Sequence, residues 1–445
     1  MGRSMTGRAL LSPVRLVPLA FAAVITMGTL LLMLPLAHPG EVQPLAAAFT
    51  AVSATCITGL TVVDTATYWT PFGKWVIVLL TQMGGFGIMS AATLLALAVR
   101  GRIDLSSSLV TQAEKQTRTL GEVARVIKRI AVMMFGVELV VGVWLTGRFL
   151  FRGLEFGDAF LHGFFYACMA FTNAGFAADT ESLMKYVSDS YVMWPIMAAV
   201  VIGSLGYPVV FELYQNWRRP DSWSVHTRLT FYGFLLLFVV GVLLFGLFEW
   251  RNSGTLGQLD AVGKINGSLA GGVMPRSAGF NAVDYGRISD ESTVVTIVLM
   301  FIGGGSAGTS GGLKVSTFFL LAFVILSEIR GEPEVTVAHR SIGAHTIRQA
   351  LTVALLSVGA VIGGSIIMVW ITNLPLVQVL FDVTSAFGTC GLSMGITPSL
   401  PPGGQILLMM LMFIGRVGTV TVASALALRT RHRHYHLPEE RPIVG

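Results

Sequence analysis

The sequence has very little charge for its length. Asp, Glu, Lys and Arg make up 12% of the 445 residues, whereas a soluble globular domain carries about 25%. Hydrophobic residues make up 53% of the chain, and the mean hydropathy is +0.71. This composition excludes a soluble enzyme and predicts an all-α polytopic membrane protein.

Cysteine is scarce too. Cys56, Cys168 and Cys390 give neither a disulfide framework nor a metal-ligand spacing. The apolar runs also lack the clustered His, Asp or Glu that an intramembrane enzyme needs, since only scattered residues such as Glu138 and His162 occur there. The first apolar stretch has no small-residue cleavage site, so we expect a retained helix and not a signal peptide.

Glycine, in contrast, is abundant, and four glycines stand in equivalent motifs. The 50 glycines include Gly59, Gly175, Gly279 and Gly391, which recur at intervals of 116, 104 and 112 residues and are each followed by Leu or Phe. Each motif follows a short apolar segment, too short to span a bilayer; these segments lie at about 44–56, 157–171, 261–274 and 377–388. Rings of backbone carbonyls can replace the water around a cation, and glycine lets the backbone approach the ion. We therefore expect four strands of one ion filter.

Long apolar runs flank every short segment. They lie at roughly 16–37, 74–99, 129–147, 191–214, 229–249, 293–327, 349–371 and 404–428. The predicted fold has eight transmembrane helices in four pseudo-symmetric repeats, each helix–pore helix–filter–helix, around one central pore. The expected repeats are 16–99, 129–217, 229–327 and 349–428, joined by cytoplasmic linkers 100–128, 218–228 and 328–348, with termini 1–15 and 429–445.

The distribution of Lys and Arg predicts the topology. Twenty of them lie in the termini and the inter-repeat linkers, against eight in or beside the segments that join paired helices. This bias puts both termini in the cytoplasm, and parallel repeats argue against a coupled transporter with inverted repeats. The net charge of +6 therefore reflects positive-inside topology and not nucleic-acid binding. His432, His434 and His436 are better read as part of a basic juxtamembrane tail than as a metal site.

Acidic residues follow three of the motif glycines. Asp64, Asp179 and Asp284 come four or five residues after the glycine, on the outer side of the expected filter. They could concentrate cations at an outer mouth. They could equally cap a helix or form a turn, and both roles can hold together.

Each second helix contains a glycine at a similar offset from its filter glycine: 25, 28, 24 and 24 residues. The third break is much longer and cannot form a rigid helix, so it is a gate candidate, with small-residue helix packing as the alternative. Arg416 lies in the fourth break, where a charge inside a span indicates function. The predicted gate comprises Gly303, Gly304, Gly305, Ser306, Ala307, Gly308, Thr309, Ser310, Gly311, Gly312, Lys314 and Arg416.

The four motifs ITGLTVVDT, NAGF, PRSAGFN and FGTCGLSMGITP, with MFIGGGSAG and MFIGRVG, resemble the Trk/Ktr/HKT superfamily of potassium transporters, most nearly the membrane subunit of bacterial Ktr systems. The resemblance covers nearly the whole chain and implies potassium uptake across the bacterial plasma membrane. The implied filter residues are Thr58, Gly59, Ala174, Gly175, Ala278, Gly279, Cys390 and Gly391. Serine in place of the first filter glycine tends to favour sodium in that family, so Gly59 favours potassium; a sodium-permeable or poorly selective cation channel is the alternative.

The same resemblance implies partners. They are a second copy of the chain, forming a homodimer with one pore per subunit, and a cytosolic KtrA-like regulatory ring that binds ATP or ADP. Membrane lipid surrounds the chain, and sodium is the expected activator. The transported potassium ion is the only metal expected at the filter, and no organic cofactor is expected in this chain.

Overall fold

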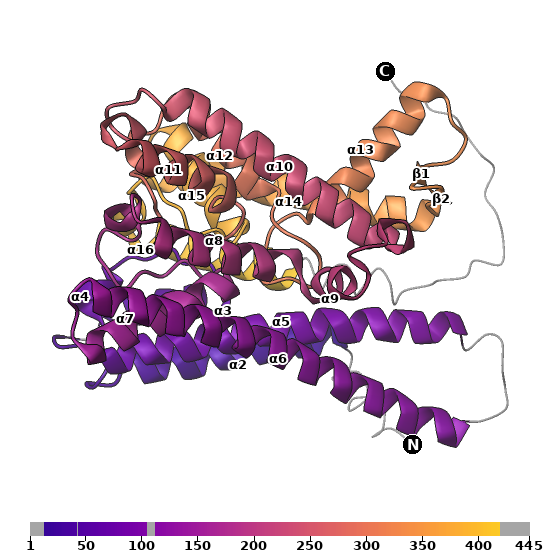
Figure 1. Ribbon diagram of the computed structural model, residues 1–445, viewed down its shortest axis with the longest axis horizontal. Coiled ribbons are helices and arrows are strands. Elements are labelled where there is room, and N and C mark those ends of the chain that lie inside the picture. The colour runs from indigo at the N-terminus through magenta and orange to yellow at the C-terminus, as the bar shows by residue number, and fades with distance from the viewer. Residues whose placement is uncertain (1–12, 42, 105–111, 419–445) are drawn as a thin grey trace.

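The computed structural model describes residues 13–41, 43–104 and 112–418, and almost all regular structure there is helical (Figure 1). The helices that correspond to the long apolar runs are α2 (Pro13–Leu32), α5 (Pro71–Asp104), α6 (Gln112–Phe151), α8 (Ser190–Leu205), α9 (Tyr207–Asn216), α10 (Val225–Glu249), α12 (Asp290–Phe301), α13 (Val315–Arg330), α14 (Ala344–Thr372) and α16 (Pro402–Phe413). One hairpin, β1 (Thr336–Val337) with β2 (Arg340–Ser341), pairs antiparallel. Residues 1–12, 42, 105–111 and 419–445 lie outside the described residues. They include most of the expected N-terminal segment 1–15, part of the first linker, the end of the fourth repeat and the whole C-terminal tail 429–445.

Four short helices coincide with the four short apolar segments. They are α3 (Pro44–Thr55), α7 (Phe156–Thr172), α11 (Ala261–Val273) and α15 (Leu376–Phe387). Their ends follow from local chemistry: α3 begins with Pro44 in its first turn, and the Asp260 carboxylate caps α11 by accepting from the Gly263 N–H at 3.0 Å. All four end just before a motif glycine, so each helix directs the negative end of its dipole toward that motif.

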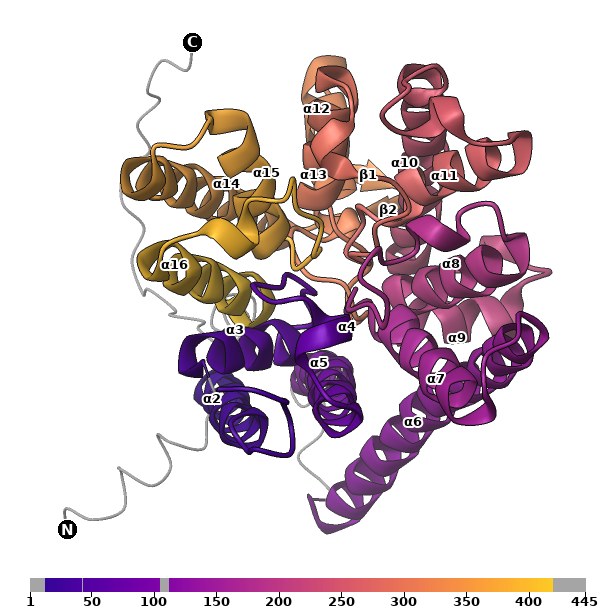
Figure 2. The ribbon, with the colours of Figure 1, turned by 90° about the vertical axis from the view of Figure 1, so that its left-hand side faces the viewer.

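The helices form four groups around one axis (Figure 2). In each group the short helix packs against the long helix before it, in the pairs α2–α3, α6–α7, α10–α11 and α14–α15. The second helix of each group contacts the short helix of the next group, in the pairs α5–α7, α8–α11, α12–α15 and α16–α3. The last pair joins the fourth group to the first, so the four groups close into a ring.

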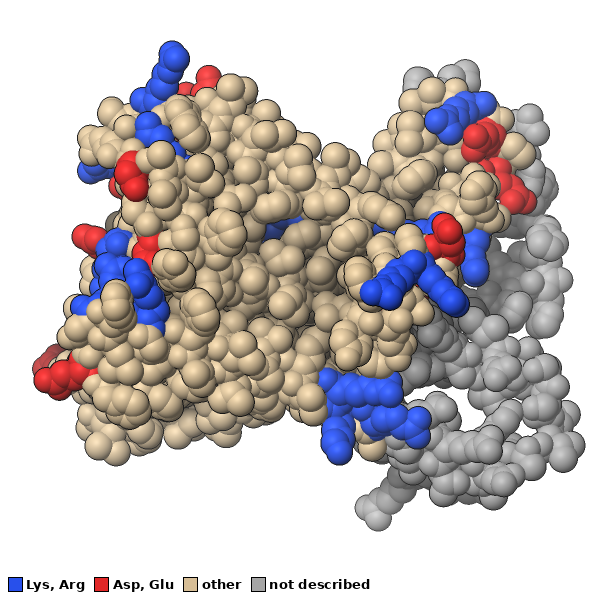
Figure 3. Space-filling view, viewed as in Figure 1, with Lys and Arg blue, Asp and Glu red and all other residues tan. Residues whose placement is uncertain are grey.

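The apolar surface fits a bilayer. In the part of the chain that the structure describes, four helices are long and apolar enough to cross a membrane, Pro71–Ala91, Ala124–Phe151, Val225–Glu249 and Ala344–Thr372. The bent pair α8–α9 makes a fifth if it is one span. Charged side chains gather toward the two ends of the molecule, and the band between them is largely uncharged (Figure 3). The chain is therefore a multi-pass membrane protein.

The four glycine breaks have four different outcomes. Helix α5 runs through its glycines without interruption, α8 and α9 meet at an angle of 101°, α12 and α13 are separated by an irregular segment, and α16 continues into a π-helical turn, Ile414–Gly418. The sequence suggested an interruption in every repeat, which is wrong for α5. There Gly84 serves packing instead, because a Cβ on it would lie 2.1 Å from the carbonyl oxygen of Thr55 at the end of α3.

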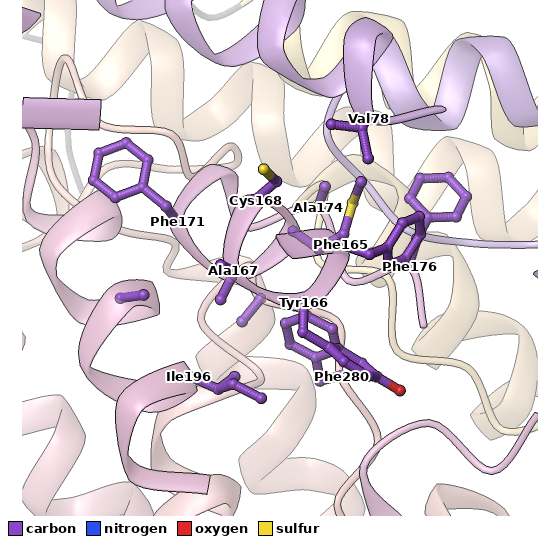
Figure 4. Packing of buried hydrophobic residues seen from close by; sticks show 14 of the residues in the cluster. Val78, Phe165, Tyr166, Ala167, Cys168, Phe171, Ala174, Phe176, Ile196 and Phe280 are labelled. Carbon is purple, nitrogen blue, oxygen red and sulfur yellow. The ribbon is translucent and has the colours of Figure 1, made fainter. Parts of the chain in front are cut away.

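The core packs tightly around α7 (Figure 4). Tyr166 of α7 lies beside Phe280, which follows the third motif glycine, with 6.0 Å between ring centroids. Both side chains are fully buried. Aromatic pairs of this kind contribute about 0.5–1.5 kcal/mol beyond their buried area. They fix the second group against the third near the axis.

Candidate functional site

The four motif glycines are neighbours in space and form a closed ring. Their backbone angles φ are +89° at Gly59, +67° at Gly175, +71° at Gly279 and +99° at Gly391, where other residues would be strained. A Cβ on each would meet a carbonyl oxygen from the next group: Ala174 at 2.3 Å, Ala278 at 2.8 Å, Cys390 at 2.4 Å and Thr58 at 2.1 Å, respectively. The fourth contact returns to the first motif, and side chains are excluded throughout.

The ring therefore brings together the eight residues predicted to form the filter. Each motif contributes one glycine and the carbonyl of the residue before it, and all of these residues are buried except Gly391, which is half-buried. Oxygens crowded in this way without counter-charge suit a cation that has shed its water. The rigid core around α7 and its counterparts holds the spacing.

Two serines hold the ring from behind. The N–H of Gly59 donates to Ser53 Oγ at 3.0 Å, and the N–H of Gly391 donates to Ser385 Oγ at 3.0 Å. Each serine stands six residues before its glycine, on the short helix. The other two short-helix positions are Met169 and Val273, so this support exists only in the first and fourth groups. Our sequence interpretation did not single out these serines, although aligning the short helices on the glycines would reveal them.

An open cavity of about 470 Å³ lies against the ring, and Asp64, Asp179 and Asp284 are among the residues that line it. The cavity is on the side of the ring that the sequence predicts to face outward. Asp64 also caps α4 (Thr65–Tyr68) by accepting from the Ala66 N–H at 3.0 Å. Asp284 likewise caps the short helix Tyr285–Arg287. Asp64 and Asp284 therefore both cap a short helix and line the cavity.

Asp179 has the densest contacts of the three. Its carboxylate accepts from Lys185 Nζ at 2.6 Å and from the hydroxyls of Tyr166 and Tyr186 at 2.9 Å each, and it pairs with His162 at 3.5 Å. Burial alone would raise the pKa of Asp179, but the hydrogen bonds from His162, Lys185 and Tyr166 outweigh it and hold that pKa well below its usual range. The carboxylate is therefore ionised beside the cavity.

The segment 303–314 lies between the ring and the opposite end of the molecule. It leaves α12 and returns to α13 through the bridge Ile302–Leu313, and most of it is buried. The Gly305 N–H donates to the Ser204 carbonyl at 2.8 Å and the Thr309 N–H to the Gly203 carbonyl at 3.1 Å, so the segment is anchored to the end of α8.

Three cationic side chains bind carbonyl oxygens of this segment. Arg416 Nη1 donates to the carbonyl of Thr309, Lys314 Nζ donates to that of Ser310, and Arg276 Nη2 donates to that of Gly303 at 3.3 Å. Arg276 and Arg416 are 0% and 2% exposed, and the ion pairs among the described residues include none of the three. Charges buried without an acidic partner are costly, so they indicate a functional arrangement.

A family model described as TrkH, cation transport protein, matches residues 12–432. The chain belongs to the TrkH family. It is therefore a cation transporter and not an enzyme.

Relatives of this TrkH-family chain match over nearly their whole length. The Ktr system potassium uptake protein B of Bacillus subtilis is 36% identical over 410 residues, covering 92% of each chain. The Ktr system potassium uptake protein D of the same organism is 31% identical, covering 98% of each. The potassium/sodium uptake protein NtpJ of Enterococcus hirae is also 31% identical, covering 98% of each.

The fold of the TrkH family is shown by a solved structure as well. The potassium transporter TrkH from Vibrio parahaemolyticus superposes with a TM-score of 0.69, covering 93% of this chain and 84% of that one, at 18% sequence identity. At this identity the likeness shows the fold alone.

Buried charged residues that the sequence interpretation of this TrkH-family chain missed include Arg276 and Asp382. Arg276 is one of the eight Lys and Arg residues counted in or beside the segments that join paired helices, but its guanidinium lies under the ring of motif glycines. The guanidinium carbon is 3.6 Å from the centroid of the Phe234 side chain. The carboxylate of Asp382 on α15 binds the loop after the fourth glycine. It accepts hydrogen bonds from Thr397 Oγ1 at 2.6 Å and from the Met394 N–H at 3.0 Å. The fourth motif lacks the Asp that follows the other three glycines. This absence could have prompted a search for an acidic residue elsewhere in the fourth repeat.

Proposed function

We propose that the chain takes up potassium through the ring formed around Gly59, Gly175, Gly279 and Gly391. The observation that carries this proposal is the cyclic contact of each glycine with the carbonyl of the next motif. Backbone oxygens arranged around an axis replace the hydration shell of potassium. The names of the two Bacillus subtilis relatives, which specify potassium uptake, support the choice of ion.

A sodium-permeable or poorly selective pathway is the second candidate. It is favoured by the name of the Enterococcus hirae relative, a potassium/sodium uptake protein. The chain has glycine at position 59, which the family resemblance associates with potassium. We therefore propose potassium as the main substrate, with sodium as an activator.

We further propose that the segment 303–314 is the gate and that Arg416 stabilises its closed position. Its place beneath the ring and the Arg416–Thr309 hydrogen bond support this role. A guanidinium beneath the ring repels cations that approach from that side. Displacing the segment would move the Thr309 carbonyl away from Arg416 and open the path.

Eight spans in four parallel repeats, with both termini in the cytoplasm, make up the proposed topology. The cyclic helix contacts and the excess of Lys and Arg in the linkers support it. Glycine breaks divide several helices into pieces shorter than a full span. For this reason a criterion of helix length alone identifies fewer spans than the eight that we propose. We also propose a homodimer on a cytosolic ring that binds ATP or ADP, consistent with the Ktr-system names of the relatives.

Uptake of rubidium or potassium in cells that lack their own potassium uptake systems tests the proposed function. We expect the full chain to restore uptake and growth at low potassium, more strongly with sodium present. A well-expressed chain that gives no uptake above vector control would contradict potassium transport. Equal uptake of sodium and potassium would favour the second candidate.

A further inference from the structure

Each motif has a second unusual residue, two positions before its glycine. Ile57, Asn173, Ser277 and Thr389 have φ angles of +57°, +60°, +78° and +46°. A left-handed conformation costs a non-glycine residue about 1–2 kcal/mol and persists only where its surroundings hold it. Four such residues in register mean that the lower rim of the ring is held under strain.

In three of the four groups this strained residue touches the segment 303–314. The Asn173 amide forms hydrogen bonds with Thr309 Oγ1 at 2.9 Å and Ser204 Oγ at 2.7 Å. A Cβ on Gly311 would lie 2.1 Å from Thr389 Oγ1, so that threonine lies directly against the segment. The first group has apolar Ile57 at this position.

Ser277 makes the most informative contacts. Its hydroxyl donates to the carbonyl of Thr389 at 2.7 Å, within the fourth motif, and accepts from the Gly311 N–H at 3.1 Å, within the segment. One oxygen therefore links the third motif, the fourth motif and the segment. The neighbouring Arg276 binds the other end of the segment at Gly303.

We propose, building on the proposed function, that Ser277 and Asn173 are positioning residues that couple the gate to the filter. The segment supports the strained rim while it lies under the ring, and the rim holds the segment in place. Displacing the segment removes the Gly311–Ser277 and Thr309–Asn173 bonds together. The rim then relaxes, so the ring geometry, and with it the choice between potassium and sodium, depends on the position of the gate.

The test measures basal rubidium flux and the rubidium-to-sodium flux ratio of the purified full chain in liposomes. For Ser277→Ala we expect basal flux to rise and the ratio to fall, each by about three- to tenfold, because two hydrogen bonds are lost. Ser357→Ala is the matched control, since among the described residues this buried hydroxyl donates only within α14, to the Val353 carbonyl at 2.8 Å. It should behave as wild type.

Asn173→Leu is a second variant, with a side chain branched in the same way but unable to form hydrogen bonds, in case Ser277→Ala does not fold. Folding is checked by size-exclusion chromatography and thermal melting. A folded variant in which both quantities change supports coupling. A change in the ratio alone would show that the residue only shapes the ring, and a change in flux alone that it only holds the segment; either result, or no change, overturns the proposal. Absence of rubidium flux in wild type would instead refute the proposed function.

Discussion

At the scale of single residues, Arg416 is 2% exposed and has no acidic partner in the part of the chain that the structure describes. Its one hydrogen bond goes to the Thr309 carbonyl, and its Nε and Nη2 atoms have no partner among the described residues. An arginine in this state is stable only while the carbonyl stays in place. The Arg416 side chain and the segment 303–314 therefore stabilise each other.

Replacing Arg416 with Gln should raise basal rubidium flux. A hydrogen bond from a charged group contributes about 1.5–3 kcal/mol, so its loss favours the open position by roughly tenfold or more. The measurement is rubidium uptake by the chain alone, with exposed Arg330→Gln as the control. If well-expressed Arg416→Gln shows the same flux as wild type, the proposal that Arg416 stabilises the closed position of the segment is wrong.

Asp179 allows a prediction that depends on pH. Because its pKa is lowered in the folded chain, its contribution to stability is present above the unfolded value near 3.9 and is lost as the pH falls through the folded value. Asp179→Asn should therefore melt at a lower temperature than wild type at pH 7. The difference between the melting temperatures of wild type and Asp179→Asn, measured in detergent, should become smaller below about pH 4. A constant difference between pH 7 and pH 3 would argue against ionised Asp179 as the cause.

At the scale of elements, the short helices could be predicted and the breaks could not. Length alone identified α3, α7, α11 and α15, since apolar segments of that size cannot span. The outcome at a glycine depends on what packs against it. Gly84 meets Thr55 at the end of α3 and stays helical, whereas Gly206 has φ +86° and ends α8.

The bend at Gly206 provides a prediction for an element. A Cβ there would lie 2.7 Å from the Ser306 carbonyl oxygen and 2.8 Å from the Gly308 nitrogen. Gly206→Ala should therefore push the segment 303–314 from its place and raise basal flux severalfold. Gly87→Ala in α5 is the control, because its Cβ would meet nothing within 4 Å. Equal flux in the two variants would show that the bend does not position the segment.

At the scale of the whole molecule, regular motif spacing was enough to predict four equivalent units, and the family resemblance pointed to the residues of the ring. The side-chain contacts that hold the ring were not predictable. Ser277 and Thr389 lie at equivalent positions of the third and fourth motifs, 112 residues apart, so the motif spacing places them near each other but does not reveal their hydrogen bond. Arg276 donates to the carbonyl of Phe234 on α10, and this pair follows no periodicity in the sequence. Such buried polar contacts are visible only once the four groups are assembled.

The central claim is that one ring, built from four glycine motifs, selects the ion. The most direct test compares rubidium uptake by wild type and Gly59→Ser in liposomes, with sodium as competitor. A Cβ at position 59 would lie 2.3 Å from the Ala174 carbonyl oxygen, so the ring must distort. We predict that wild type keeps its rubidium uptake in excess sodium. In Gly59→Ser the selectivity for rubidium over sodium should fall at least about tenfold, which corresponds to roughly 1.4 kcal/mol. A folded Gly59→Ser that discriminates as well as wild type would contradict the account.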